Sequence, residues 1–395
     1  MKIFLFLSGL QVGGAERFAA GLSAALASRG HDVSVVTWPS DSPDFYPLSK
    51  DVGRLVVPVR SNRAGALRMV RDNLARVAAL RGLICLHRPD VMVGMIESNA
   101  ILALLAAQGT RTRVIAAERI YPPWTDSSRP WRFLRWLLYR FADGVTVQTG
   151  ASAAWMRRHV PTRRLAVIPN AIHLPLPAGD PIQDPLLHIP EGTRVILNAG
   201  RLVPQKGQAL LIRSVAPLLA ANREWVLVIA GEGPERAALV TLIESLGMAG
   251  RIMLVGAVGN MADWYQRAEI FVLSSRFEGF PNALLEAMAH GCACVSLDIE
   301  AGPRDLIEHG LNGLLVDPAE ATGGVKRAVG RLLEDESLRN RLSATARSVV
   351  EKFAFDRIAL EWEDFISPLP KKHRSLSDLS AGTVSQMGSA DRKDI

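Results

Sequence analysis

Short apolar runs alternate with longer amphipathic segments along the first half of the chain. An apolar run at residues 3–7 leads into a glycine turn, an amphipathic segment at 15–29 and a second apolar run at 31–38. This order of strand, glycine turn, helix and strand is typical of a Rossmann-like opening and predicts a parallel sheet. Four more apolar runs continue the pattern, at residues 91–95, 113–117, 144–149 and 165–168.

The same alternation begins afresh in the second half, after a loop with five prolines at residues 175–190. The prolines, preceded by Pro169-Asn170, predict a hinge. We therefore predict an N-terminal lobe at residues 1–175 and a C-terminal lobe at 176–350. Two successive α/β lobes place a cleft between the carboxyl ends of two sheets, where ligands bind in such folds. The strands expected in the second lobe are residues 195–199, 225–230, 252–255, 270–273, 293–297 and 313–316.

Length and composition fit two folded domains. A chain of 395 residues is too long for one ordinary core, because single cores stop growing at about 250–300 residues. Hydrophobic residues make up 48% of the chain and charged residues 22%, which is typical of a soluble protein. No run of about 20 apolar residues occurs, so we expect no membrane-spanning segment. An odd count of three cysteines predicts no disulfide framework and a reducing, cytoplasmic location.

Charge is spread unevenly between the two halves. Residues 1–185 contain 23 Lys and Arg against 13 Asp and Glu, a net charge of +10, whereas the remainder has 23 against 26, a net charge of −3. Such asymmetry indicates an anionic partner for the first half. Nucleic acid is not expected, because no zinc finger, RNP signature or basic heptad region occurs. An anionic membrane face or a phosphate-bearing acceptor fits better.

The segment at residues 275–291 is the most informative part of the chain. It sets Glu278 and Glu286 eight positions apart, with Pro281 and Asn282 leading into a predicted helix. Unpaired backbone N–H groups at a helix N-terminus form a ready site for phosphate. A carboxylate at each end of this arrangement can bind hydroxyls on either side of the phosphate, one of a sugar and one of a ribose. Taken alone, the two glutamates also fit a solvated loop residue and a surface helix residue.

Two cations follow the first predicted strand of the second lobe. Arg201 and Lys206 lie in the segment Gly-Arg-Leu-Val-Pro-Gln-Lys-Gly at residues 200–207. A guanidinium fork and a mobile ammonium suit two adjacent phosphoryl groups. Cations directed at a leaving diphosphate help most in the transition state. Simple solvation of both side chains at the surface is the alternative.

These segments together resemble the retaining family 4 glycosyltransferases, which have the GT-B fold. Glu278 to Glu286 is similar to the family's E-x7-E element, and residues 200–207 resemble its diphosphate-binding G-R-x-x-x-x-K-G. Gly-Gly-Ala-Glu-Arg at residues 13–17 resembles its N-terminal glycine loop, and later landmarks match at 231–234 and 301–316. The likeness spans residues 1–366.

The resemblance implies an α/β GT-B architecture of two Rossmann-like, doubly wound domains that face each other across a cleft. The N-terminal domain would bind the acceptor and the C-terminal domain the nucleotide sugar. A helix at residues 351–366 would cross back to pack on the N-terminal domain. The polar tail at residues 367–395 is expected to be disordered.

The resemblance also assigns roles to residues. Glu286 would bind the nucleotide ribose and Glu278 the donor sugar hydroxyls, and Arg201, Lys206 and Glu278 are candidate catalytic residues. Gly13 and Gly14 would let the backbone approach the diphosphate or donor sugar without a Cβ, although a purely structural turn is the alternative. The remaining donor-binding candidates are Gly231 and Glu232 near the base, and Phe280, Pro281, Asn282, Ala283 and Leu284 around the sugar and the distal phosphate.

The chain departs from the family pattern after the fourth predicted strand. Many relatives carry a His there, near the reacting sugar, whereas this chain reads Ala-Glu-Arg-Ile-Tyr-Pro at residues 117–122. We predict that Arg119 takes over contact with phosphate or sugar as a further catalytic residue. Glu118 is expected to orient it.

The reaction expected from the resemblance uses no metal and no other cofactor. No Asp-x-Asp motif occurs, and the nearest segment, Asp298-Ile299-Glu300, is interpreted as a loop. The resemblance implies retention of configuration by front-face substitution, in which the departing phosphate oxygen takes the acceptor proton. A double displacement would need a carboxyl group beside the anomeric carbon, and none is assigned.

A second informative segment is the Arg- and Trp-rich stretch at residues 129–141. On a helix, Trp131, Leu134, Leu138 and Phe141 share one face, and arginines interrupt the others. Arginine with tryptophan on a short amphipathic helix suits an anionic lipid surface. A core helix with solvated arginines is the alternative. The first reading predicts a protein peripheral to the inner face of the plasma membrane.

The predicted function is transfer of a hexose or N-acetylhexosamine from a nucleotide sugar, with UDP favoured over GDP. The acceptor would be a polysaccharide or a lipid-linked glycan. A nucleotide-sugar-binding subunit without activity and a GT-B nucleotide-sugar epimerase are the alternatives. An epimerase would form product from donor alone.

Overall fold

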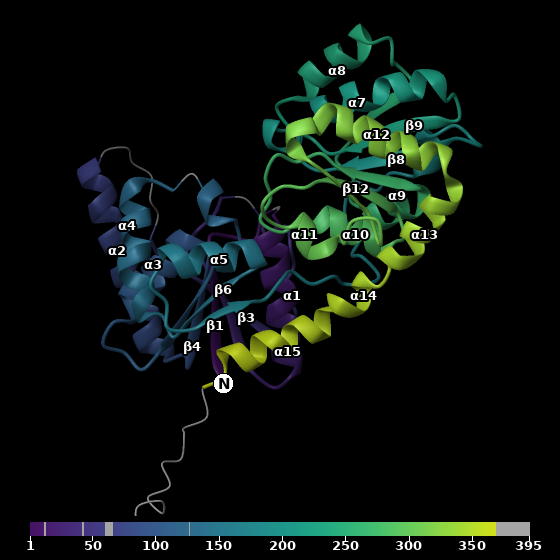
Figure 1. The fold of residues 1–395 in the computed structure, drawn as a ribbon. Coiled ribbons are helices and arrows are strands. Elements are labelled where there is room, and N and C mark those ends of the chain that lie inside the picture. The colour runs from purple at the N-terminus through teal and green to yellow at the C-terminus, as the bar shows by residue number, and fades with distance from the viewer. Residues whose placement is uncertain (12, 42, 60–65, 126, 369–395) are drawn as a thin grey trace, which may run out of the picture.

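Two parallel β-sheets, each covered by helices, form two lobes joined by a long connection (Figure 1). The structure is a computed structural model. It describes residues 1–368 except 12, 42, 60–65 and 126, and it leaves out the side chains of residues 66–70. The tail predicted at residues 367–395 therefore lies almost wholly outside the described residues.

The first sheet has seven parallel strands in the order β3-β2-β1-β4-β5-β6-β7. The strand order reverses between β1 and β4, and ligands bind beyond the carboxyl ends of strands at such a switch point. The strands are β1 (Lys2–Leu7), β2 (Asp32–Thr37), β3 (Val52–Val56), β4 (Val91–Met95), β5 (Arg113–Ala117), β6 (Gly144–Val147) and β7 (Leu165–Val167).

The second sheet repeats this design with six parallel strands in the order β10-β9-β8-β11-β12-β13. Its switch point lies between β8 and β11. The strands are β8 (Arg194–Ala199), β9 (Trp225–Ala230), β10 (Ile252–Gly256), β11 (Ile270–Leu273), β12 (Ala293–Leu297) and β13 (Leu314–Val316).

Helices alternate with the strands in both lobes. The first lobe and the connection contain α1 (Gly14–Ser28), α2 (Ala66–His87), α3 (Glu97–Ala107), α4 (Arg129–Leu138), α5 (Gly150–His159) and α6 (Pro185–His188). The second lobe contains α7 (Gln208–Ala221), α8 (Arg236–Ser245), α9 (Met261–Arg267), α10 (Asn282–Ala289), α11 (Pro303–Leu306), α12 (Ala321–Glu334), α13 (Glu336–Ala346) and α14 (Val349–Lys352), and α15 (Phe355–Ile366) follows. Short 3-10 turns are η1 (Pro122–Trp124), η2 (Tyr139–Phe141), η3 (Pro204–Lys206) and η4 (Pro318–Glu320).

Both faces of the inner strands of each sheet are buried. Along β1, Phe4 and Phe6 pack into one core while Ile3 and Leu5 pack into the core on the other face. Successive side chains of a strand point to opposite faces, so a strand buried on both sides must be almost entirely apolar. The uninterrupted apolar runs that predicted a parallel sheet have this physical origin.

Strand β3 was not predicted from the sequence. Its residues Val-Gly-Arg-Leu-Val mix buried and exposed positions, and the strand lies at the edge of the sheet, where only β2 pairs with it. An edge strand needs no continuous apolar run, because one of its sides faces solvent.

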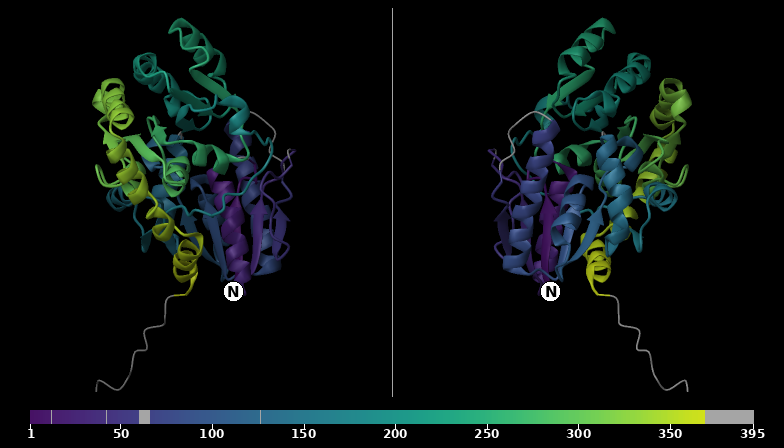
Figure 2. Two further views of the ribbon diagram at one scale, coloured as in Figure 1. Left: turned by 90° about the vertical axis from the view of Figure 1, so that its right-hand side faces the viewer. Right: turned by 90° about the vertical axis from the view of Figure 1, so that its left-hand side faces the viewer.

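Helix α15 returns the chain to the first lobe, as the resemblance implies. Trp362 on this helix is fully buried, and its ring lies 6.1 Å from the ring of Phe18 on α1. An isolated bridge between Ile172 and Ala354 joins the connection to the start of this return. Figure 2 shows the segment running down one side of the molecule from the second lobe to the first.

Helix α4 turns a different face to solvent from the predicted one. Three of the four residues assigned to its apolar face pack on the core of the first lobe, namely Trp131, Leu134 and Leu138. The exposed aromatic side chains of this stretch are Phe133, Trp136 and Phe141, at 58%, 45% and 50% exposed. Of these, Phe141 alone belongs to the predicted face, so the apolar surface is built from other residues than expected.

Arg135 of α4 points inward and does not contribute to a basic surface. Its side chain is 2% exposed, with Nη1 3.3 Å from an oxygen of Glu97 and 3.7 Å from one of Glu118. The hydroxyl of Tyr139 donates a hydrogen bond to Glu118 at 2.7 Å. Glu97 and Glu118 follow β4 and β5, so α4 is anchored at the carboxyl edge of the first sheet. Among the described residues, no helix combines the length and apolar content needed to cross a bilayer.

Candidate active site

Three loops that leave the switch-point strands carry most of the predicted site residues. The loop after β1 holds the first glycines, the loop after β8 holds Arg201 and Lys206, and the loop after β11 leads through Glu278 into α10. Because the carboxyl ends of parallel strands meet at one edge of a sheet, the loops after β8 and β11 lie together. The loop after β1 approaches them from the first lobe, where Gly14 lies close to the Asn282 side chain. The structure therefore places segments distant in sequence on either side of one cleft.

Lys206 and Glu278 are in direct contact. The Lys206 ammonium lies 2.6 Å from a carboxylate oxygen of Glu278, and both side chains are largely buried. Two further hydrogen bonds join the loop after β8 to the loop after β11. The Arg276 backbone N–H donates to the carbonyl of Gln205, and the Gln205 side-chain amide donates to the carbonyl of Phe277. This fixes the cation beside the carboxylate that is expected to face the donor sugar. Arg201 stands earlier in the same loop with an exposed side chain.

The start of α10 faces the first lobe. Asn170, from the connection after β7, donates from Nδ2 to the side-chain oxygen of Asn282 at 2.8 Å. A Cβ added to Gly14 would lie 3.0 Å from the Asn282 amide nitrogen. The first N–H groups of a helix have no acceptor within it, so the tip of α10 presents donors where the glycine turn of the first lobe approaches it.

Arg119 is buried at the same place. Its Nη2 donates to the side-chain oxygen of Asn170, which also accepts from Gln148 at 2.6 Å, and its guanidinium lies 4.0 Å from the centre of the Phe18 ring. Burial lowers the pKa of Arg119 to about 9, while the charge of Glu16 opposes this. Its Nε is buried without a hydrogen-bond partner. A buried cation that lacks a contacting carboxylate within the described residues suits an anionic ligand.

Glu118 does not orient Arg119. Its carboxylate is bound by Tyr139 and Arg135 on the side of α4. Successive residues of an extended segment point to opposite sides, so neighbours in sequence diverge in space. The predicted partnership of Glu118 with Arg119 is therefore wrong.

Glu286 links the two lobes. One of its carboxylate oxygens lies 2.9 Å from Nη1 of Arg17 on α1, and the other accepts a hydrogen bond from Tyr265 at 3.1 Å. Burial and the charge of Glu286 both raise the pKa of Tyr265, which keeps the phenol protonated as a donor. Arg17 was quoted in the glycine-loop motif but not predicted as a site residue. The sequence places Arg17 in the glycine-loop motif, but it does not indicate that the side chain extends across the cleft to the second lobe.

The glycine after β9 is required by its surroundings. Gly231 has a φ of 146°, and a Cβ there would lie 2.0 Å from the carbonyl oxygen of Gly200. Few L-residues adopt this backbone region. The next residue, Glu232, is half-exposed and forms an ion pair with Arg236 one helical turn later at 2.8 Å. Close packing of the loops after β8 and β9 therefore shapes this end of the site.

Two residues predicted around the donor use their side chains for packing. Phe280 and Leu284 are buried in the second lobe, and the ring of Phe280 lies 5.8 Å from that of Phe353. Only their backbone groups are available to a ligand. Pro281 precedes the first residue of α10, and its carbonyl accepts from the N–H groups of Leu284 and Leu285. Ala283, in the first turn of α10, is partly buried and packs against the core of the second lobe.

Further contacts close the cleft on its other side. The hydroxyl of Tyr121 donates a hydrogen bond to Glu300, and the indole of Trp124 stacks on the ring of Phe277 with centroids 5.3 Å apart. A Cβ on Gly279 would lie 2.8 Å from the Arg119 carbonyl oxygen. No role was predicted for Tyr121 or Trp124, because nothing in the neighbouring sequence indicates which loop residues meet across a cleft.

No cluster of three or more His, Cys, Asp or Glu side chains suited to a metal ion occurs among the described residues. Asp298 forms hydrogen bonds at 2.5 and 2.6 Å to the Arg304 guanidinium. Cys292 and Cys294 are buried in the second lobe and free, and Cys85 is exposed and free.

Two doubly wound lobes, with loops that meet at facing switch points, have the GT-B architecture of glycosyltransferases. Comparison with known proteins supports this class. Residues 12–175 match the family described as Glycosyltransferase Family 4, and residues 181–349 match the family described as Glycosyl transferases group 1. The chain belongs to glycosyltransferase family 4, and the predicted fold class is confirmed.

Two curated relatives come from Campylobacter jejuni. The GalNAc-alpha-(1->4)-GalNAc-alpha-(1->3)-diNAcBac-PP-undecaprenol alpha-1,4-N-acetyl-D-galactosaminyltransferase is 27% identical over 93% of this chain and 98% of its own length. The N-acetylgalactosamine-N,N'-diacetylbacillosaminyl-diphospho-undecaprenol 4-alpha-N-acetylgalactosaminyltransferase is 30% identical over 66% of this chain and 70% of its own length.

Solved structures share the fold at lower sequence identity. Sucrose-phosphate synthase from Thermosynechococcus elongatus superposes with a TM-score of 0.78 at 19% identity, covering 92% of this chain and 97% of its own. HepE of Anabaena in complex with UDP gives a TM-score of 0.77 at 20% identity, covering 93% and 100%.

Proposed function

We propose that this glycosyltransferase moves a hexose or N-acetylhexosamine from a UDP-sugar to a lipid-linked glycan, with retention of configuration and without a metal ion. GDP is the alternative nucleotide. The names of the two Campylobacter relatives both include a sugar linked to undecaprenol through a diphosphate, which supports the acceptor class. The UDP complex of HepE supports the nucleotide.

The observation that carries the proposal is the set of positive groups gathered around the start of α10. Lys206 lies against Glu278, and Arg119 reaches Asn282 through Asn170. A side-chain cation from each lobe and a helix N-terminus form a site for two adjacent phosphoryl groups. Arg119 has no contacting carboxylate within the described residues, so burying its charge without an anionic ligand is costly.

In the proposed reaction the acceptor hydroxyl attacks the anomeric carbon from the face that the diphosphate leaves. The bond between the anomeric carbon and the phosphate oxygen breaks, the new glycosidic bond forms, and the acceptor proton passes to the departing phosphate oxygen. Lys206, Arg201 and Arg119 stabilise the negative charge that develops on the diphosphate. Glu278 holds the sugar hydroxyls and Glu286 the ribose hydroxyls.

Donor binding gives the direct test. UDP-sugars are expected to raise the melting temperature in proportion to the logarithm of their concentration, and GDP-sugars to raise it less. Glu286→Gln should weaken UDP-sugar binding about 10- to 100-fold, because hydrogen bonds to charged groups contribute about 1.5–3 kcal/mol. Glu351→Gln, at an exposed position of α14, is the matched control. If UDP-sugars raised the melting temperatures of the Glu286 variant and of the control equally, the assignment of Glu286 to the ribose hydroxyls would be wrong.

Product analysis separates this proposal from its alternatives. A transferase releases UDP faster when acceptor is present, whereas an epimerase forms product from the donor alone. A subunit that only binds the nucleotide sugar would release no UDP above background, with or without acceptor.

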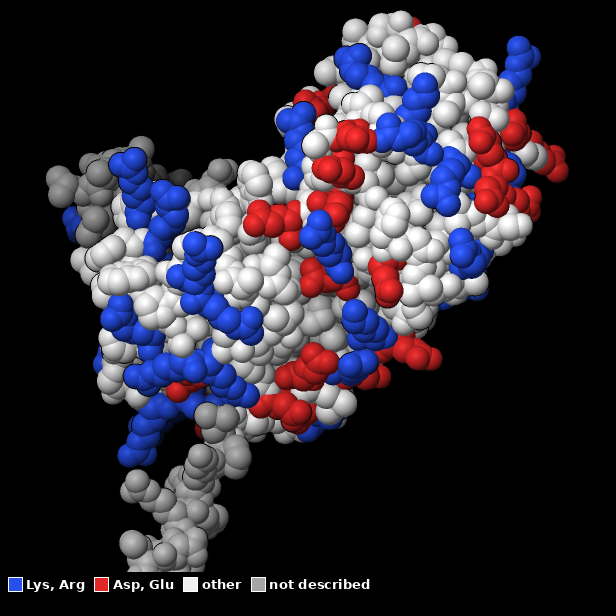
Figure 3. Space-filling model, in the orientation of Figure 1, with Lys and Arg blue, Asp and Glu red and all other residues white. Residues whose placement is uncertain are grey.

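We also propose that α4 contacts an anionic membrane, where a lipid-linked acceptor resides. Phe133 and Trp136 are exposed on this helix, next to the exposed arginines Arg129 and Arg132. Aromatic and basic side chains on one amphipathic helix suit the headgroup region. Figure 3 shows Lys and Arg side chains spread over the first lobe with few acidic ones among them, whereas the second lobe mixes both.

Vesicle binding tests this contact. The protein is expected to sediment with vesicles that contain about one-third phosphatidylglycerol and to be released by salt, because the attraction is screened. Replacing Arg129 and Arg132 by Glu should abolish sedimentation. The matched control replaces Arg327 and Arg331, on α12 of the second lobe, by Glu. Binding that ignores lipid charge, or that survives the α4 changes, would refute the membrane proposal.

A further inference from the structure

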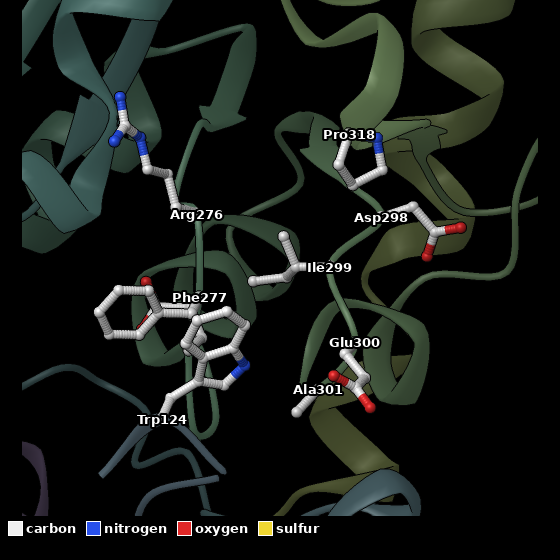
Figure 4. Close-up of a pocket in the computed structure, with 9 residues that line it drawn as sticks. Trp124, Arg276, Phe277, Asp298, Ile299, Glu300, Ala301 and Pro318 are labelled. Atoms are coloured by element: carbon white, nitrogen blue, oxygen red, sulfur yellow. The ribbon is translucent and has the colours of Figure 1, made fainter. Parts of the chain in front are cut away.

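A pocket of about 200 Å³ lies beside the donor site, at the seam between the two lobes (Figure 4). The loop after β11 and the loop after β12 form its walls, and Trp124 of the first lobe closes one end. Glu278 is part of both this pocket and the predicted donor site. A molecule in the pocket would therefore lie next to the transferred sugar.

One wall of the pocket is aromatic. The rings of Trp124 and Phe277 are stacked and nearly parallel, with 8° between their planes, and Trp124 is 49% exposed. Figure 4 shows Ile299 reaching toward these rings from the opposite loop. The electron-rich face of an aromatic ring attracts positively polarised C–H groups, such as those on one face of a pyranose ring.

Polar groups at the edge of the pocket are acidic. Glu300 lies across from Trp124 in Figure 4, is exposed and is held in place by the Tyr121 hydroxyl. Burial and Glu300 together raise the pKa of Tyr121, so the phenol stays a donor and one carboxylate oxygen remains for a ligand. The one basic lining residue, Arg276, points away from Trp124 in this view.

We propose that this pocket is the subsite for the terminal sugar of the acceptor, and that it selects a neutral pyranose over an anionic one. The proposal rests on the proposed function, because a sugar in this pocket is an acceptor only if a sugar donor binds in the adjacent site. Pockets for drug-sized ligands measure roughly 300–1,000 Å³, so this smaller space suits a single ring. Lys206 pairs with Glu278 and Arg304 pairs with Asp298, so these two carboxylates are compensated. Glu300 has no cationic partner among the described residues and is bound by the neutral Tyr121 hydroxyl, so its carboxylate would repel a uronic acid or a sugar phosphate.

Saturation-transfer NMR with simple glycosides tests the subsite in the full chain loaded with UDP. Methyl α-glucoside and methyl α-N-acetylgalactosaminide are the neutral probes, and methyl β-glucuronide is the anionic probe. At least one neutral probe is expected to bind, and the glucuronide to show no signal. Trp124→Ala should weaken the neutral probe about tenfold, in line with the value of aromatic contacts. Leu86→Ala, at an exposed position of α2, is the control and should leave it unchanged.

A second variant examines the selectivity. Glu300→Gln keeps the size of the side chain and its bond from Tyr121 but removes the charge, so methyl β-glucuronide should now bind. The thermal shift by UDP is measured on the same samples. Absence of that shift would refute the proposed function. A normal UDP shift without any neutral glycoside signal, or with signals that Trp124→Ala leaves intact, would refute the subsite alone.

Discussion

Replacing Lys206 by Ala is expected to lower turnover by about 10²- to 10³-fold, the size of effect seen when one preorganised electrostatic stabiliser is lost. The Lys206 ammonium lies 2.6 Å from Glu278, whose side chain is 9% exposed. Without the cation, this carboxylate faces the departing diphosphate with no compensation and adds repulsion. Initial-rate measurement of UDP release with saturating donor reports the effect on turnover.

The design of this experiment separates charge from shape. Lys326→Ala, at an exposed position of α12, is the matched control and should retain full activity. Lys206→Arg keeps the charge but not the compact ammonium, so its turnover should lie between that of Lys206→Ala and that of Lys326→Ala. If Lys206→Ala changed only the apparent donor affinity and left turnover intact, the lysine would stabilise the ground state and the transition state equally.

Replacing Arg135 by Met is expected to destabilise the protein by about 3–5 kcal/mol, the usual cost of removing one partner from a buried ion pair. Arg135 is 2% exposed and lies between Glu97 and Glu118, and its guanidinium is 5.1 Å from the centre of the Trp155 ring. Urea denaturation followed by fluorescence measures the change. Arg132→Met, exposed on the same helix, should shift stability by less than about 0.5 kcal/mol.

The loss of stability in Arg135→Met should also depend on pH. Burial raises the pKa of Glu118 from 4.5 to about 7, while Arg135 and Tyr139 act to lower it. Removing Arg135 raises the folded-state value further and leaves the unfolded-state value unchanged. A carboxyl group with a raised folded-state pKa loses stability as pH rises above its unfolded value. The destabilisation should therefore be larger at about pH 8 than at about pH 5, and a loss independent of pH would point to packing alone.

The parallel sheets and the site loops were predictable because their signals are local. A strand buried on both faces must be apolar throughout, which marks β1 and β9 directly in the sequence. Glycines, Pro281 and Asn282 mark the turn before α10, and Lys206 is tied to the end of β8 by a short segment. The edge strand β3 escaped prediction, because an exposed edge places no such demand on composition.

The direction of each charged side chain was not predictable in the same way. Arg132 and Arg135 are three positions apart on one helix, yet the first is exposed and the second is buried beside two carboxylates. What distinguishes them is the position of α4 over the ends of β4 and β5. Glu118 and Arg119 diverge for a related reason, since adjacent residues leave the sheet edge on opposite sides.

The amino-acid sequence by itself determined the two α/β lobes, the proline-rich connection between them and the residue types of the loops that leave the switch-point strands. Those features depend on periodicity and turn chemistry within short windows. Only the tertiary structure decided that Arg17 reaches Glu286, that Arg119 lies buried behind Asn170, and that Trp124 faces Phe277. These pairs join residues more than 50 positions apart. The pairs of Arg17 and Trp124 depend on how the two lobes pack across the cleft, whereas Arg119 and Asn170 meet because β5 and β7 end at the same edge of the first sheet.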